Sequence, residues 1–195
     1  GIAKMLNFAH GDVIMIGSYV VYFAFGASGL NPVLSIVLSM IVCTILGVVI
    51  ERLAYRPLRE APSLAVLITA IGVSYLLQQV AQLSWSSNPK SFTSVVSGMK
   101  PVSLFGGQLT ISAETIVTIV ACVVIMVVLM WFVNYTPAGH AMLAVSEDRG
   151  AAQLMGVNVN GTISLTFAIG SALAAIAGAL LCSSYPTLQP TTGAM

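Results

Sequence analysis

Long apolar stretches alternate with polar connections along the whole chain. Five windows are mostly apolar and approach the roughly 20 residues that a helix needs to cross a bilayer. Two of them begin at or directly after a proline, Pro32 and Pro62, where the first turn of a helix tolerates this residue. The pattern predicts an all-α fold, a polytopic bundle of transmembrane helices with about five spans. The expected spans are residues 13–30, 33–50, 63–83, 114–133 and 163–182.

The composition excludes a water-soluble fold. Hydrophobic residues make up 57% of the 195 residues and charged residues only 7%, whereas a soluble domain carries about 25% charged residues. So few charges cannot cover a water-exposed surface, and the solvent must therefore be lipid. The net charge of +1 gives no indication of a nucleic-acid partner. We interpret residues 1–195 as a single transmembrane domain that is incomplete at both ends.

Lysine and arginine are distributed unequally between the connections. Five spans would place the N-terminal segment, residues 51–62 and residues 134–162 on one side of the membrane, and residues 84–112 on the other. The first side carries Lys4, Arg52, Arg56, Arg59 and Arg149, and the second carries Lys90 and Lys100. The positive-inside rule therefore predicts that the first side is cytoplasmic. The long polar segment 84–112 is expected to form an excursion outside the membrane, with a short hairpin or a re-entrant part.

Three polar side chains stand directly before the first span, namely Asn7, His10 and Asp12. Ionisable groups at membrane depth are costly, and they usually mark a transport pathway or a paired structural site. These residues are therefore our candidates for a substrate path. The alternative is a helix entrance in the membrane interface, where Asp12 would favour the positive end of the helix dipole.

We assign no catalytic residues and no metal site. Neither a nucleophile nor a set of metal ligands accompanies His10, and no pair of cysteines has the spacing of metal ligands. An intramembrane enzyme would need an activated nucleophile. The span residues Ser39, Ser74 and Ser171 have no histidine or acidic partner nearby in the sequence.

The run ERLAYRPLR follows the second span, at residues 51–59. The positive-inside bias accounts for its three arginines without any specific function. Glu51 is a candidate to form an ion pair with one of them.

In the last span, Gly170, Ala174 and Gly178 recur every four residues. Small residues at this spacing let a second helix approach closely. The second helix would belong either to the same bundle or to another subunit.

The connection 134–162 holds a cluster of charges and is predicted to form a short amphipathic helix over residues 140–155, stopped by Gly156. Such a helix suits either docking into a groove on a soluble partner or lying on the lipid surface. The chain has no phosphate-binding loop of the form GxxxxGK[ST]. Any ATP hydrolysis is therefore assigned to another polypeptide.

Several stretches, taken together and in this order, resemble the LivH-type permeases of branched-chain amino acid ABC importers. The resemblance covers nearly the whole chain, and it is the combination of the stretches that is specific. The stretches are residues 7–12 with Met15 and residues 17–19, residues 51–59, residues 69–74, residues 147–158, and residues 166–174 with residues 177–178.

The resemblance implies a non-enzymatic, multi-pass subunit of the bacterial inner membrane that translocates leucine, isoleucine and valine. It implies a second permease subunit, homologous or identical, two cytoplasmic ATPase subunits that use ATP, and a periplasmic substrate-binding protein. The chain itself would bind no cofactor. Residues 134–162 match the cytoplasmic coupling loop of these permeases, with Glu147, Asp148, Ala151, Ala152 and Gly156 as the loop's candidate residues.

Two other functions remain as alternatives. ABC permeases for urea or short-chain amides share a similar set of motifs. An ion-coupled secondary transporter, a different class of protein, would use His10 and Asp12 as relay groups and would need no ATP.

Overall fold

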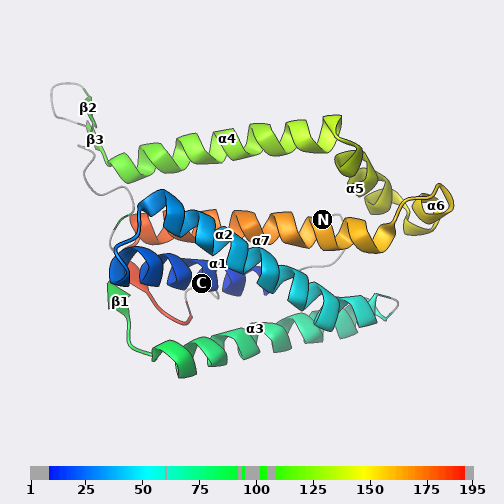
Figure 1. The fold of residues 1–195 in the computed structure, drawn as a ribbon, viewed down its shortest axis with the longest axis horizontal. Helices are drawn as coiled ribbons and strands as arrows, with labels where there is room; N and C mark the ends of the chain where they lie inside the picture. Colours follow the sequence, from blue (N-terminus) through cyan, green and yellow to red (C-terminus); the bar gives the residue numbers. More distant parts are fainter. Residues whose placement is uncertain (1–8, 60, 92–93, 95–101, 105–108, 192–195) are drawn as a thin grey trace.

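A computed structural model describes residues 9–59, 61–91, 94, 102–104 and 109–191 (Figure 1). This part of the chain is predominantly helical, which confirms the predicted all-α class. Two π-helical segments, η1 (Tyr22–Ala27) and η2 (Glu51–Tyr55), and a 3-10 turn, η3 (Arg56–Leu58), extend α1 and α2. The α-helices are α1 (His10–Val21), α2 (Pro32–Ile50), α3 (Ser63–Trp85), α4 (Ala113–Tyr135), α5 (Pro137–Glu147), α6 (Arg149–Leu154) and α7 (Val159–Ser184).

Within the described residues, four helices are long and apolar enough to cross a membrane. They match four of the predicted spans. The remaining predicted span, residues 13–30, corresponds to α1 and η1 and is not one of these four helices. The expected number of about five spans is therefore close. Polar residues in the first turn of α1 lower its mean hydropathy. The four helices are Pro32–Leu58, Leu64–Trp85, Ala113–Tyr135 and Val159–Ser184.

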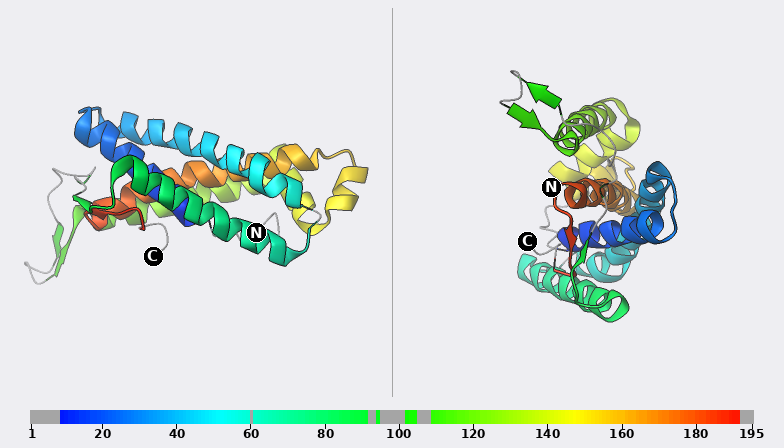
Figure 2. Two further views of the ribbon diagram at one scale, coloured as in Figure 1. Left: turned by 90° about the horizontal axis from the view of Figure 1, so that it is seen from below. Right: turned by 90° about the vertical axis from the view of Figure 1, so that its left-hand side faces the viewer.

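Helix α1 lies at the centre of the bundle rather than at its surface. It contacts α2, α3 and α7, and the end-on view in Figure 2 shows it between them. Asp12, Met15 and Tyr19 are fully buried. Because protein rather than lipid surrounds α1, this helix tolerates polar residues that a lipid-facing helix would not.

Small residues bring the helices into close contact. A Cβ atom added to Gly17 of α1 would lie 2.9 Å from the Cα atom of Ala175 in α7, and one added to Gly178 would lie 2.5 Å from the carbonyl oxygen of Ile14. The hydroxyl of Ser39 in α2 donates a hydrogen bond of 2.8 Å to the carbonyl oxygen of Gly17. Backbone contact of this kind substitutes for the hydrophobic driving force that lipid removes.

Helices α2 and α7 are also packed closely, around Gly47. A Cβ atom at this position would lie 2.6 Å from the Cβ atom of Ser171 and 3.3 Å from the carbonyl oxygen of Phe167. Glycine at this position therefore allows the two helices to pack this closely.

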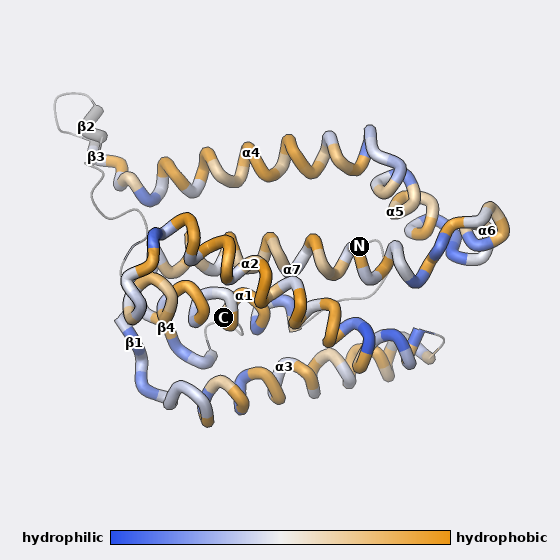
Figure 3. Tube along the Cα trace, in the orientation of Figure 1, coloured by the Kyte–Doolittle hydropathy of each residue, from blue (hydrophilic) through white to orange (hydrophobic). Residues whose placement is uncertain are grey.

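Helices α3 and α4 lie at the periphery. Helix α3 meets the rest of the bundle through α1 and η2. Helix α4 contacts α5 and α7, is apolar along most of its length (Figure 3), and has no buried residue after Ala113. Its surroundings are therefore lipid or another protein.

Polar residues gather at the two ends of the bundle (Figure 3). The turn between α2 and α3 lies at the same end as α5 and α6, and the β-strands lie at the opposite end (Figure 1). Arg52, Arg56, Arg59 and Arg149 therefore share one end, as the predicted topology requires, and Lys90 lies at the other. Lys4 and Lys100, which also entered that prediction, are outside the described residues.

The connection 84–112 contains the expected hairpin. Strand β2 (Val102–Leu104) pairs antiparallel with β3 (Leu109–Ile111), and β1 (Lys90–Ser91) pairs antiparallel with β4 (Thr187–Leu188). The rings of Tyr19 and Trp85 stack with their centroids 4.5 Å apart close to β1. Strand pairing and ring stacking together join α1, α3 and the C-terminal segment at this end.

The helix predicted over residues 140–155 is two helices, and this prediction needs correction. Asp148 separates α5 from α6 because it adopts an extended backbone (φ −146°, ψ 115°). Its carboxylate caps α6 by accepting hydrogen bonds from the backbone N–H groups of Gly150 and Ala151, at 2.8 and 3.1 Å. Gly156, with φ +86°, ends α6 as predicted.

We predict that Gly47→Ala destabilises the protein by about 1–3 kcal/mol, because the new methyl group overpacks the crossing of α2 and α7. The free energy of unfolding in detergent measures this effect. Gly72→Ala in α3 is the matched control, since a Cβ atom there meets nothing within 4 Å. Equal stability of the two variants would contradict the close contact described here.

Candidate functional site

The central polar site of the bundle joins α1 to α3 through Asp12. The Ser74 hydroxyl donates a hydrogen bond to Oδ2 of Asp12, and Nε2 of Gln78 donates one of 3.0 Å to Oδ1. Nε2 of Gln78 also lies 3.2 Å from the Ser74 oxygen. Ser74 and Gln78 are one helical turn apart and therefore face α1 together.

Asp12 is a buried carboxylate whose described hydrogen-bond partners are all neutral. Its side chain is 0% exposed and lies in the middle of a membrane bundle. Burial of a charge is expensive unless hydrogen bonds or an opposite charge compensate for it. A site of this kind, rich in acceptor oxygens, suits a positively charged group, and an ionisable residue at this depth is a candidate for function.

His10 and Asp12, the two substrate-path candidates that the structure describes, face different helices. Asp12 faces α3, whereas His10 points toward α7, where its Cε1 atom lies 4.0 Å from the position of a Cβ atom on Gly170. Asn7 lies outside the described residues. Among the hydrogen bonds of the described residues, none joins His10 to Asp12.

Reasoning from the sequence missed Ser74 and Gln78 as partners of Asp12. Ser74 was set aside for lack of an acidic neighbour, but Asp12 reaches it from 62 positions away. A signal was present, because two polar residues four apart in an apolar helix mark one polar face. The sequence does not indicate which helix that face meets.

A second polar cluster, the Glu51 network, lies where α2 ends. It consists of Glu51, Arg59, Asn160 and Ser164. Arg59 forms an ion pair with Oε1 of Glu51 through Nη2 and donates a hydrogen bond to Oδ1 of Asn160 through Nη1. The Ser164 hydroxyl donates a hydrogen bond of 2.6 Å to Oε2 of Glu51. The predicted pairing of Glu51 with one of the nearby arginines is thereby confirmed, and the partner is Arg59.

Glu51 faces inward from the π-helical segment η2. π-helical turns are rare and occur often at functional sites. Here the segment places both Glu51 and Tyr55 in the interior, each 0% exposed, and Tyr55 packs on Phe167 of α7 with ring centroids 5.4 Å apart. Arg52 and Arg56 remain exposed.

The α5–α6 segment exposes an apolar tip. Leu154 and Met155 are 89% and 84% exposed. A pair of capping hydrogen bonds fixes the turn that follows them, from the N–H of Gly156 to the carbonyl of Gln153 and from the N–H of Val157 to that of Ala152, both 3.0 Å. The tip is therefore a rigid projection.

The candidate residues of this segment have different positions. Glu147, Asp148, Ala151 and Gly156 are exposed. Ala152 is buried against Val145 and Ile163 and packs the segment onto α7. The sequence does not distinguish the buried Ala152 from the exposed Leu154, because burial at these positions depends on how α6 folds back onto α7.

The stripe of small residues in α7 faces the interior of the same chain. Gly178 meets α1 at Ile14 and Ser18. Ala174 is buried in a cluster with Val13 and Cys43. Gly170 lies nearest to His10.

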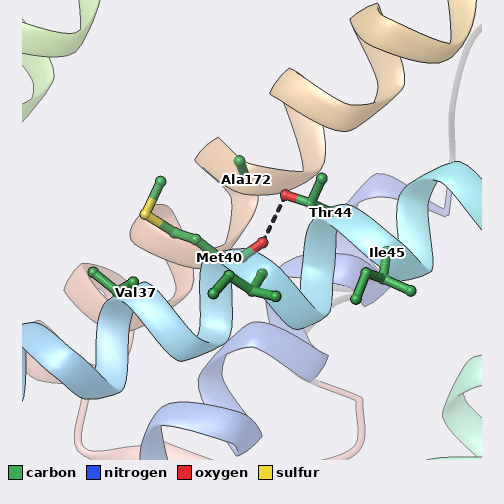
Figure 4. A pocket seen from close by; sticks show the side chains of 6 residues that line it. Val37, Met40, Thr44, Ile45 and Ala172 are labelled. Carbon is green, nitrogen blue, oxygen red and sulfur yellow. Dashed lines mark hydrogen bonds between the residues drawn. The ribbon is translucent and has the colours of Figure 1, made fainter.

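A groove of about 380 Å³ opens on the outer face of α2 and α7 (Figure 4). The hydroxyl of Thr44 already donates a hydrogen bond of 2.6 Å to the carbonyl oxygen of Met40. The groove thus offers little that would orient a polar ligand, and it suits a hydrocarbon chain. Its lining is Val37, Met40, Ile41, Thr44, Ile45 and Ala172. Among the residues that the structure describes, no cluster of potential metal ligands occurs.

Comparison with known proteins relates this chain to membrane permeases. A family model described as "Branched-chain amino acid transport system / permease component" matches residues 1–195. The high-affinity branched-chain amino acid transport system permease protein BraD of Pseudomonas aeruginosa is 39% identical over 99% of this chain and 66% of its own length. The corresponding protein LivH of Escherichia coli K12 is 36% identical over 100% of this chain and 66% of its own length.

A more distant relative is the probable branched-chain amino acid transport permease protein LivH of Methanocaldococcus jannaschii, which is 30% identical over 96% of this chain and 59% of its own length. No solved structure matches the chain. The fold is that of a multi-pass α-helical membrane protein. The chain belongs to the family of branched-chain amino acid transport permease components, as the resemblance in its motifs predicted.

We predict that Asp12→Ala destabilises the protein by about 1–3 kcal/mol, because it leaves the buried Gln78 amide and the half-buried Ser74 hydroxyl without their common acceptor. Asp12→Asn retains an acceptor and a similar shape, so its free energy of unfolding in detergent should stay within about 1 kcal/mol of the wild type. Gln79→Ala, on the exposed face of α3, is the control for α3 itself. A stable Asp12→Ala variant would show that the site does not hold α1 and α3 together.

Proposed function

We propose that this chain forms the membrane-spanning part of a permease subunit that imports leucine, isoleucine and valine across the bacterial inner membrane at the expense of ATP. The observation that carries the proposal is the family match over residues 1–195, with named branched-chain amino acid permeases 36–39% identical over almost the whole chain. These relatives are longer than this chain, which spans 66% of their length.

The proposed assembly contains a second permease subunit, two cytoplasmic ATPase subunits and a periplasmic substrate-binding protein. The absence of a GxxxxGK[ST] loop from the sequence supports assigning ATP hydrolysis to a partner. In this assignment the chain is a non-catalytic transport subunit and holds no cofactor of its own. The helix α4, which buries little against the rest of the chain, leaves ample surface for a second permease.

The proposed substrate path runs beside α1, with Asn7, His10 and Asp12 as its candidate residues. An amino acid is a zwitterion, and its ammonium group needs acceptors inside the membrane. Asp12 with Ser74 supplies acceptor oxygens at the interface of α1 and α3. Because the site is closed here, passage requires α3 to move away from α1, as expected for alternating access.

The proposed coupling element is the α5–α6 segment, with residues 134–162 as the cytoplasmic coupling loop. An exposed apolar projection on a rigid turn is suited to insertion into a groove of a soluble partner. Leu154 and Met155 would make this contact. Glu147, Asp148 and Ala151 border it, Ala152 anchors the segment on α7, and Gly156 closes the turn.

Reconstitution of the full-length subunit with its partner permease, ATPases and binding protein tests the function. We expect leucine-loaded binding protein to stimulate ATP hydrolysis and leucine uptake into vesicles, and urea-loaded binding protein to stimulate neither. Stimulation by urea alone would favour the amide and urea alternative. Uptake under an ion gradient without ATP would favour the ion-coupled transporter and contradict the proposal.

In the same vesicles, Asp12→Asn separates a role in passage from a role in folding. Since this variant should keep the fold, we expect it to assemble normally and yet to lower leucine uptake by about tenfold or more, because the acceptor loses its negative charge. Normal uptake would remove Asp12 from the path.

The exposed tip gives a further prediction. Replacing both Leu154 and Met155 by Ser should weaken binding of the ATPase subunit to the permease by about tenfold or more, since apolar anchors in a groove carry much of the binding energy. Binding measured in detergent checks this, and the fold should be unaffected because both side chains are exposed. Gln153→Ser, an exposed polar change on the same helix, is the control. Unchanged binding of the double variant would exclude the tip as the docking contact.

A further inference from the structure

The Glu51 network is not explained by membrane topology. The positive-inside bias needs only that Arg52, Arg56 and Arg59 lie at the cytoplasmic end, and Arg52 and Arg56 do so while exposed. Glu51 is instead 0% exposed, and the side chain of its partner Arg59 is 11% exposed. Burying two charges costs desolvation energy that their attraction repays only with good geometry. The network therefore serves something other than orientation.

The network connects three parts of the chain. Glu51 is the residue that follows α2, and Arg59 lies in the turn that leads to α3. Asn160 and Ser164 belong to the first turns of α7. A single guanidinium bonds Glu51 and Asn160 at once, which fixes the turn against α7 in both distance and direction.

The same turns of α7 carry the α5–α6 segment. Ile163, adjacent to Ser164, is 0% exposed and packs against Val145 of α5 and Ala152 of α6. Only the short link from Met155 to Asn158 separates α6 from α7. One face of α7 therefore holds the α5–α6 segment, and polar groups in the same turns hold the α2–α3 turn.

An apolar contact reinforces the connection. Tyr55, one turn after Glu51, packs on Phe167, which also borders the cluster of Ile163. Further along, Gly47 lets α2 pack closely on α7 at Ser171. A displacement of the first turns of α7 is thus passed to α2 and to the turn before α3.

We propose that Glu51 and Arg59 are positioning residues for energy coupling. Through Asn160 and Ser164 they transmit movement of the α5–α6 segment to α2 and to α3, the helix that closes over Asp12. This inference rests on the proposed ATP-driven import and adds to it the residues through which the movement passes. It predicts that loss of the ion pair separates ATP hydrolysis from transport while the subunits still assemble.

The test uses the complete reconstituted importer, with leucine uptake and ATP hydrolysis measured in the same vesicles. Glu51→Gln and Arg59→Gln should each lower the ratio of leucine transported to ATP hydrolysed by about tenfold, the scale of effect expected for residues that carry coupling between sites. The double variant should be no worse than either single variant, because both changes remove one interaction. Arg56→Gln is the matched control, with the same change of charge in the same turn, and its ratio should equal that of the wild type.

Each other outcome has a definite meaning. An unchanged ratio in both single variants overturns the inference and leaves the proposed function intact. If both variants fail to assemble, Ser164→Ala tests the inference instead, because it removes the hydrogen bond to Glu51 and keeps the ion pair between Glu51 and Arg59. A lowered ratio in this assembled variant supports the inference, and a normal ratio assigns the network a structural role only and overturns it. A wild-type importer without ATP-dependent leucine uptake overturns the proposed function, and the inference with it.

Discussion

The position of α1 between α2, α3 and α7 allows this bundle to hold polar groups in its interior. In lipid, polar groups must find their partners inside the protein. Helix α1 carries the polar residues His10 and Asp12, and α2, α3 and α7 surround it. Gly17 and Gly178 permit this, because each lies where a Cβ atom would meet the backbone of the facing helix. A polar central helix and a tightly packed shell therefore require each other.

The two polar clusters are at different depths and have different chemistry. Asp12 is held by the neutral donors Ser74 and Gln78, so it retains an attraction for positive charge. Glu51 is neutralised by Arg59 and bonded by Ser164, which makes it a fixed joint between chain segments. One arrangement suits transient binding and the other suits mechanical connection. The Asp12 site joins α1 to α3, and the Glu51 network joins the end of α2 to α7.

The sequence is most informative where one physical signal dominates. Apolar length located the four long spans to within a few residues at most ends, and Gly156 marked the end of α6 correctly. The sequence is less informative where competing local effects determine whether a helix continues. Residue Asp148 interrupts the expected helix because its side chain prefers to cap α6. The meeting of Asp12 with Ser74, or of Arg59 with Asn160, depends on tertiary packing across 62 and 101 positions, and no local pattern encodes it.

The peripheral position of α4 affects how the protein can adapt to membranes of different thickness. The helix has 23 residues, which at about 1.5 Å per residue gives a length of about 35 Å, against a hydrocarbon layer of about 30 Å. Because no residue of α4 after Ala113 is buried, α4 can lean to match a thinner or thicker bilayer without breaking contacts between the other helices. Hydrophobic mismatch would then be absorbed by this one helix, and the polar interior around α1 would keep its geometry in membranes of different lipid composition.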